Sequence, residues 1–219
     1  AGFATDASPD IYAPCMERAA SLVSPGGGYT MIVPISFQFS DRGFDVARKA
    51  ILDALSPCWA STYSRNPSAL FDAGLGVRST IVIGRKSSDS DRQVLTTGLR
   101  RWWDEARPFL FDTNTYEPVP LRRRADPWPR LGSPDMAELF DVLTAKGSTI
   151  ARAASRTGAS LGFKQTALYY LSVFIEEPPS WEMDGTRIPQ TKVGSLYFPD
   201  ERTRDIAFVL LAGRLGVWW

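Results

Sequence analysis

The 219-residue sequence contains no histidine and only two cysteines, Cys15 and Cys58. The lack of histidine excludes Ser-His-Asp and Cys-His catalysis and most transition-metal sites. Because the two cysteines are far apart in the sequence, zinc is not expected either. We interpret them as reduced, buried thiols of a cytoplasmic protein, and we predict no metal cofactor.

Long apolar runs and a strong net charge are also missing. No apolar stretch approaches the length of a membrane span, and no signal peptide is recognisable, so we expect no membrane partner. The net charge is +1, so any contact with nucleic acid must come from a local basic patch. The first residues, Ala1-Gly2-Phe3, and the last two, Trp218 and Trp219, are unusual for natural termini, which favours a piece of a longer protein.

The clearest local pattern is Pro-Gly-Gly-Gly-Tyr-Thr-Met-Ile-Val-Pro at residues 25–34. Its glycines allow a sharp turn, and Tyr29 to Val33 has the length and residue types of a strand buried on both faces. Apolar residues at helical spacing predict helices over 11–23 and 41–55. This order of elements is typical of half an α/β layer.

Polar residues and β-branched runs refine this prediction. Asp10 and Asp41 stand where side-chain caps of the two helices are expected. Strands are predicted for Cys58 to Tyr63 and for Val77 to Gly84, and Gln93 to Thr97 is expected to return as an antiparallel strand. We therefore predict an α/β fold with a mostly parallel sheet and an antiparallel edge strand.

The composition changes after residue 107. Residues 108–134 are rich in proline and contain Arg122, Arg123 and Arg124, which predicts a linker or an arm that wraps residues 1–107. Residues 135–219 are expected to form a smaller α+β region. Its predicted elements are helices over 135–145 and 202–219, strands over 166–175 and 193–198, and a glycine-containing loop over 158–164.

No catalytic constellation can be built from spacing alone. Adjacent carboxylates such as Glu176-Glu177 point apart on regular structure and indicate solvated surface charge. The glycines at 26–28 lack both the lysine of a phosphate loop and the spacing of a dinucleotide-binding fingerprint. They are better interpreted as a turn into a strand.

Four motifs in a fixed order nevertheless resemble a known family. The first motif is a helix of the form Leu-Tyr-x-x-Phe-(x)-Glu-(x)-Ala, which is similar to Ile11-Tyr12-Ala13-Pro14-Cys15-Met16-Glu17-Arg18-Ala19. The second is a Leu-x-Pro-Gly-Gly turn with a strand ending in Val-Pro, which is similar to Val23-Ser24-Pro25-Gly26-Gly27 through Val33-Pro34. Ala47-Arg48-Lys49 stands for a Leu-Arg-like pair, and Leu70-Phe71 precedes the β-branched run 77–86. In this respect residues 10–86 resemble the second half of the catalytic domain of adenine-specific N-6 DNA methyltransferases of the restriction-modification and phage-defence type.

The resemblance implies a fold, a reaction and partners. The fold would be the second half of a Rossmann-like methyltransferase sheet, followed by a target-recognition-like region over 135–219. The reaction would transfer a methyl group from S-adenosylmethionine to the exocyclic N-6 amine of adenine in double-stranded DNA. The family's glycine-rich cofactor loop and its Asn-Pro-Pro-Tyr loop are absent, so the chain is not expected to be active alone. S-adenosylmethionine would bind mainly to a missing N-terminal half or partner subunit, whose strand would abut the strand at 29–33.

The resemblance also implies individual roles. Phe71 matches the aromatic residue that stacks on the flipped adenine, although a core aromatic is an alternative interpretation. Tyr12 and Pro34 match positions that shape the floor of the pocket. Candidate DNA-phosphate contacts are Arg122, Arg123, Arg124, Arg152, Arg156 and Lys164, for each of which a solvated surface position is the alternative. A non-catalytic DNA-binding or assembly module derived from the same fold, and a coincidental α/β domain, remain open as other functions.

Overall fold

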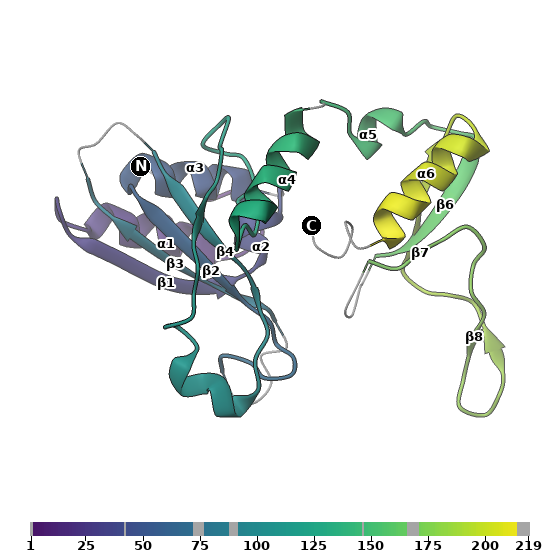
Figure 1. Cartoon of the computed structure of the whole chain (residues 1–219), viewed down its shortest axis with the longest axis horizontal. Coiled ribbons are helices and arrows are strands. Elements are labelled where there is room, and N and C mark those ends of the chain that lie inside the picture. The colour runs from purple at the N-terminus through teal and green to yellow at the C-terminus, as the bar shows by residue number, and fades with distance from the viewer. Residues whose placement is uncertain are drawn as a thin grey trace. The chain divides into compact units, whose positions relative to one another are not determined.

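The structure is a computed structural model that describes residues 2–41, 43–71, 77–87, 92–145, 147–165 and 171–213. The chain divides into two compact units, unit 1 with residues 1–143 and unit 2 with residues 144–219 (Figure 1). Unit 1 is a mixed α/β structure, and unit 2 combines a small sheet with short helices.

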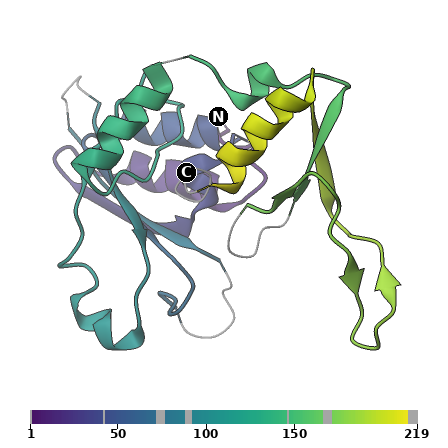
Figure 2. The ribbon, with the colours of Figure 1, turned by 45° about the vertical axis from the view of Figure 1, so that its right-hand side comes forward.

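Unit 1 is built on a five-stranded sheet with the order β1-β3-β2-β4-β5 (Figures 1 and 2). Strand β3 pairs antiparallel with both β1 and β2, β2 pairs parallel with β4, and β4 pairs antiparallel with β5. Strands β1, β2 and β4 therefore run in the same direction. The strands are β1 (Gly28–Pro34), β2 (Cys58–Tyr63), β3 (Ser79–Arg85), β4 (Val94–Arg100) and β5 (Glu117–Pro118).

The mixed α/β class and the positions of the four predicted strands are confirmed, but the predicted pairing is wrong in two respects. The sheet contains a single parallel pair, β2 with β4, so it is not mostly parallel. The residues of β4 do not return beside β3 as an antiparallel strand. Because β3 lies between β1 and β2 and uses both of its edges there, β4 cannot pair with β3 and instead pairs with the other edge of β2.

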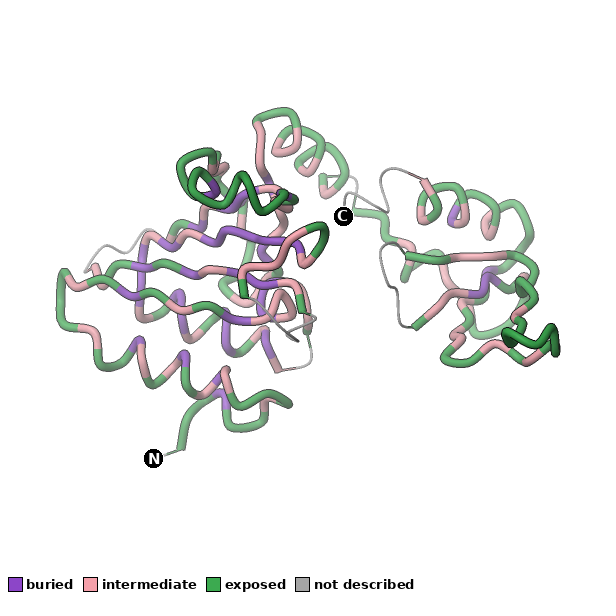
Figure 3. Tube along the Cα trace, turned by 90° about the horizontal axis from the view of Figure 1, so that it is seen from below, coloured by how far each residue is buried: buried purple, intermediate pink, exposed green. Residues whose placement is uncertain are grey.

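Strand β1 is not buried on both faces as predicted. Tyr29 and Val33 are buried, whereas Ile32 is 44% exposed. The alternation arises because β1 is an edge strand with one face packed against α1, which contacts both β1 and α3. The tube coloured by burial shows the same alternation along the strands of unit 1 (Figure 3).

The helices of unit 1 begin close to their predicted positions but are capped differently. Helices α1 (Tyr12–Leu22), α2 (Ser36–Phe39) and α3 (Phe44–Ala54) precede or follow β1. Neither α1 nor α3 has a side-chain cap, so the prediction for Asp10 and Asp41 is wrong. The residue before α3 is Gly43, whose φ of 80° is left-handed and suits glycine.

Asp41 binds a buried arginine instead of capping α3. The side chain of Arg48 is fully buried and donates to the carbonyl oxygens of Phe37, Ser40 and Ala125 at 2.9, 2.8 and 3.0 Å. It also pairs with the Asp41 carboxylate at 3.2 Å. Burial lowers the pKa of Arg48, and the nearby Asp41 charge opposes that shift. This network joins the α2 region to the segment around residue 125.

Residues 108–134, predicted as a linker or arm, belong to unit 1 and pack against its sheet. Trp128 and Leu131 are fully buried, and Trp128 contacts Phe37 edge to face. The segment crosses β4 at Gly132, where an added Cβ would lie 2.5 Å from the backbone nitrogen of Gly98. A 3-10 helix, η1 (Asp104–Phe109), precedes the segment, and α4 (Pro134–Ala145) follows it at its predicted position.

Unit 2 contains a three-stranded sheet with the order β10-β6-β7, whose strands all pair antiparallel. Leu161, Phe198 and Ala207 form its buried core. A two-stranded hairpin, β8 with β9, extends from this sheet (Figure 2). The elements are α5 (Ile150–Ala153), β6 (Ala159–Lys164), β7 (Val173–Phe174), β8 (Ser180–Trp181), β9 (Arg187–Ile188), β10 (Val193–Phe198) and α6 (Glu201–Ala212).

The strand predicted over 193–198 is confirmed as β10, but the loop predicted over 158–164 is wrong. These residues form β6, in which Gly162 and Gly194 leave room for the rings of Phe174 and Phe163. The predicted strand over 166–175 falls partly outside the described residues, which contain β7 at its end. The predicted helix over 202–219 is described as α6, and residues 214–219 lie outside the described part. No described helix has the length and apolar character needed to cross a membrane.

Candidate functional site at one end of the sheet

Three strands of unit 1 end at the same edge of the sheet. Pro34 of β1 and Tyr63 of β2 both lie opposite Ser79, the first residue of β3. Tyr63 also lies opposite Arg100, the last residue of β4. The segments that leave β1, β2 and β4 therefore begin at this edge, which is where open α/β sheets bind ligands.

The loop that carries Phe71 leaves β2 at this edge and is held by several hydrogen bonds. The Ser64 N–H donates to the Arg100 carbonyl at 2.8 Å, and the Ser68 N–H donates to the Trp102 carbonyl at 3.2 Å. The guanidinium of Arg107 donates to the carbonyls of residues 69 and 70 at 2.9 and 3.2 Å. The loop is thus pinned immediately before Phe71.

The two apolar residues of the loop have different environments. Leu70 packs against the buried cluster of Tyr63, Trp102 and Leu110. Phe71 is 46% exposed. The alternative that Phe71 is simply a core aromatic is therefore not supported, because a core ring would be covered. A pinned loop that presents a half-exposed ring is suited to stacking on a flat ligand.

Tyr12 and Pro34 also lie at this edge. Pro34 is the last residue of β1, and Ser36 follows it by two residues. The Tyr12 hydroxyl lies 2.8 Å from the hydroxyl oxygen of Ser36. The Tyr12 ring stacks on Phe44 with centroids 5.3 Å apart. Burial raises the pKa of Tyr12 to about 12, against the opposing hydrogen bond with Ser36. Tyr12 is therefore neutral and held in place.

The basic residues predicted to contact DNA in residues 108–134 are spread along an exposed turn. Arg122 is exposed. Arg123 pairs with Asp126 at 2.8 Å, and Arg124 pairs with Asp53 of α3. Both ion pairs occupy guanidinium donors that a phosphate would need.

The predicted basic residues of unit 2 are not brought together. Arg152 lies on α5 and donates to the Gly147 carbonyl at 2.6 Å, while Arg156 is exposed before β6. Lys164 ends β6 and donates to the Thr191 carbonyl at 3.1 Å. Because a strand rises about 3.3 Å per residue, the two ends of β6 are well separated, and Arg156 and Lys164 at these ends do not form one phosphate site.

The structure instead places four other arginines at the candidate edge. Arg78 immediately precedes β3, Arg101 immediately follows β4, Arg65 follows β2 by two residues, and Arg130 lies close enough to act electrostatically on this group. We call them the sheet-end arginines. Sequence reasoning missed them because they are isolated in the chain, and only Arg65 stands just beyond the end of a predicted strand.

Exposed aromatics continue from this edge into the η1 region. Trp103, Phe109 and Phe111 are 71%, 64% and 58% exposed. Tyr63, beneath them, contacts both Trp102 and Phe111 edge to face and accepts a hydrogen bond from Asn114. The η1 region and the loop after β2 lie at the same end of the sheet in both views (Figures 1 and 2).

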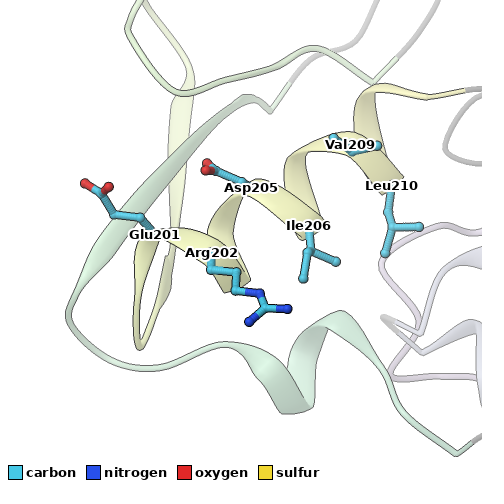
Figure 4. A pocket seen from close by; sticks show the side chains of 6 residues that line it. All are labelled: Glu201, Arg202, Asp205, Ile206, Val209 and Leu210. Atoms are coloured by element: carbon cyan, nitrogen blue, oxygen red, sulfur yellow. The ribbon is translucent and has the colours of Figure 1, made fainter.

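Unit 2 offers a different surface on α6. The exposed face of this helix lines a hollow with both charged and apolar side chains (Figure 4). Ala207 lies on the buried side, against the small sheet. The residues that line the hollow are Glu201, Arg202, Asp205, Ile206, Val209 and Leu210.

In the described part of the chain, no group of three or more histidine, cysteine, aspartate or glutamate side chains is arranged to hold a metal ion. Comparison of the chain with models of known protein families, and with curated proteins, finds no match. Any functional conclusion therefore depends on the geometry of the site and on the resemblance in its motifs.

Proposed function

We propose that this chain supplies the later strands and the base-stacking side of an S-adenosylmethionine-dependent DNA adenine N-6 methyltransferase of restriction-modification or phage-defence type. The observation that carries the proposal is Phe71, a half-exposed ring on a pinned loop at the carboxyl end of β2. A base must leave the duplex stack before its amine can react, and an aromatic face can hold it there.

The free edge of β1 is a second support. Within the described residues β1 pairs only with β3, so its other edge carries unpaired backbone donors and acceptors. The motif resemblance implies that the strand bearing the Asn-Pro-Pro-Tyr loop lies beside this strand. A segment from another polypeptide that adds to β1 would bring that loop to the edge where Pro34, Tyr12 and the Phe71 loop gather.

The proposal divides the chemistry between two polypeptide segments. The segment with the glycine-rich loop and the Asn-Pro-Pro-Tyr loop binds most of the S-adenosylmethionine and aligns the adenine amine for methyl transfer. In this chain Phe71 stacks on the adenine, and Tyr12 and Pro34 form the pocket floor. No residue of this chain donates or accepts a proton in the transfer.

Methylation of an adenine-containing duplex by the reconstituted pair tests the role of Phe71. Phe71→Ala should lower methyl transfer roughly 10- to 100-fold, because base–aromatic stacking contributes about 1–3 kcal/mol, while duplex binding stays nearly intact. Phe3→Ala is the matched control, since Phe3 is also half-exposed in unit 1 at 39%. Wild-type turnover in Phe71→Ala would remove Phe71 from the site.

Calorimetric binding of S-adenosylmethionine separates this proposal from the non-catalytic alternative. Binding only when the second segment is present supports a divided methyltransferase. If neither the chain nor the mixture binds the cofactor, the DNA-binding or assembly module becomes the better interpretation. Amide exchange of β1 adds an independent readout, because strand addition should slow exchange in residues 28–33.

A further inference from the structure

The sheet-end arginines are a group of cations that the fold brings together at one edge of the sheet. Arg65 and Arg78 stand at the two ends of the loop that carries Phe71, and Arg101 follows the strand to which that loop is hydrogen-bonded. Phe71 is thus flanked along its loop by two of these cations. These arginines are far apart in the sequence. The register of β2 with β3 and β4 brings Arg65, Arg78 and Arg101 to the same edge.

The arginines act on one another electrostatically. Burial lowers the pKa of Arg78, and the charges of Arg65 and Arg101 lower it further. Burial likewise lowers the pKa of Arg130, with added contributions from Arg78 and Arg101. Arg78 and Arg130 therefore each lie in the electrostatic field of two other arginines of the group.

One of the four guanidinium groups is fixed in orientation. Arg130 lies over the ring of Phe39, with its central carbon 5.4 Å from the ring centroid. Phe39 ends α2, directly after β1, and is thus part of the same edge. A cation held over an aromatic face is preorganised for a ligand, because little side-chain freedom is lost on binding.

We propose that the sheet-end arginines bind the backbone phosphates of a DNA strand, next to the nucleotide whose base stacks on Phe71. The strand assignment rests on the proposed function, whereas the phosphate site itself does not. A nucleotide carries both an anion and a flat apolar ring, which matches a group of arginines on either side of an exposed phenylalanine. An acidic peptide would use the charges but leave the ring without a partner.

Binding of a fluorescein-labelled, adenine-containing single-stranded hexamer, followed by anisotropy over a range of KCl concentrations, tests this inference. The double variant Arg65→Gln/Arg101→Gln should weaken binding at least tenfold. It should also reduce the slope of log K against log salt by about 1.4, since each single-strand phosphate contact contributes about 0.7. Arg18→Gln, at an exposed position of α1, removes the same kind of charge and should change neither quantity.

Two further measurements keep the outcomes distinct. Arg65→Lys/Arg101→Lys keeps both charges and should recover most of the salt slope, and circular dichroism of each variant reports on folding. A folded glutamine variant with wild-type affinity and slope overturns the phosphate site, even if Phe71→Ala still abolishes methylation. A lowered slope together with no effect of Phe71→Ala on methylation keeps the phosphate site and removes the proposed role in methyl transfer.

Discussion

The two units use their charged side chains in different ways. In unit 1, Arg48 is fully buried and makes four hydrogen bonds, and the sheet-end arginines converge on one edge. In unit 2, Arg152 and Lys164 each donate to a single carbonyl at the surface, and Arg156 is exposed. The difference teaches that basic residues close in sequence need not meet, whereas residues distant in sequence meet when strand register brings them together.

Replacing a matched arginine in each unit should give the largest contrast. Arg48→Met removes all four hydrogen bonds and leaves three carbonyls without this donor, so we expect a loss of about 3–5 kcal/mol in the stability of unit 1. Arg152→Met in unit 2 should cost less than about 1 kcal/mol, because its single bond is solvent-exposed. Urea unfolding followed by amide exchange in each unit measures both, and equal losses would break the comparison.

Alkaline pH should destabilise unit 1 through its buried thiol. Burial raises the pKa of Cys58 from 9.0 to about 12, so above pH 9 the unfolded chain releases this proton first and stability falls as the pH rises. The thiol alone should account for about 1.4 kcal/mol by pH 10. Unfolding at pH 8 and pH 10 measures the loss, which should be about 1.4 kcal/mol smaller in Cys58→Ala. The remainder comes from buried tyrosines such as Tyr12, whose pKa is also raised by burial. An equal loss in this variant would assign the whole effect to other groups.

Removing a helix cap should give the smallest effect, and one that is confined to unit 2. Asp200 accepts a hydrogen bond at 2.8 Å from the Thr203 N–H at the start of α6. Asp200→Ala should lower the melting temperature of unit 2 by roughly 4–8 °C. Asp10→Ala is the matched control before α1, where the aspartate does not cap, and it should leave unit 1 unchanged. A similar shift in both variants would contradict the contrast in capping.

The sequence predicted element positions in unit 1 better than the pairing between elements. Apolar spacing identified α1 and α3, and β-branched residues identified β3, because these signals are local. The place of β3 between β1 and β2 depends on contacts between distant residues, which no local pattern encodes. In unit 2, glycines at 158 and 162 suggested a loop, but they mark tight contacts with Phe198 and Phe174 around strand β6.

For the candidate site, the residues that match a motif of the resembled family were easier to predict than the residues that strand pairing brings together. Phe71, Tyr12 and Pro34 lie at the carboxyl edge of the sheet, and Phe71 is exposed there. The arginine run at 122–124 attracted attention because it is contiguous, yet two of its members are engaged in ion pairs. Arg65, Arg78, Arg101 and Arg130 carried no contiguous signal, so only the structure reveals them as a group.

The contact between Gly98 and Gly132 has a consequence for how the length of this chain can vary. Thr96 fixes the same crossing, since its hydroxyl donates to the Pro129 carbonyl and accepts from the Leu131 N–H. Residues 99–131 therefore form a long loop whose two ends are held together by their own contacts, whatever the length of the chain between them. For a flexible closed loop, doubling the length costs only about 0.6 kcal/mol. Insertions in the exposed turn at Asp112 and Thr113 should be tolerated, whereas a side chain at Gly132 should not.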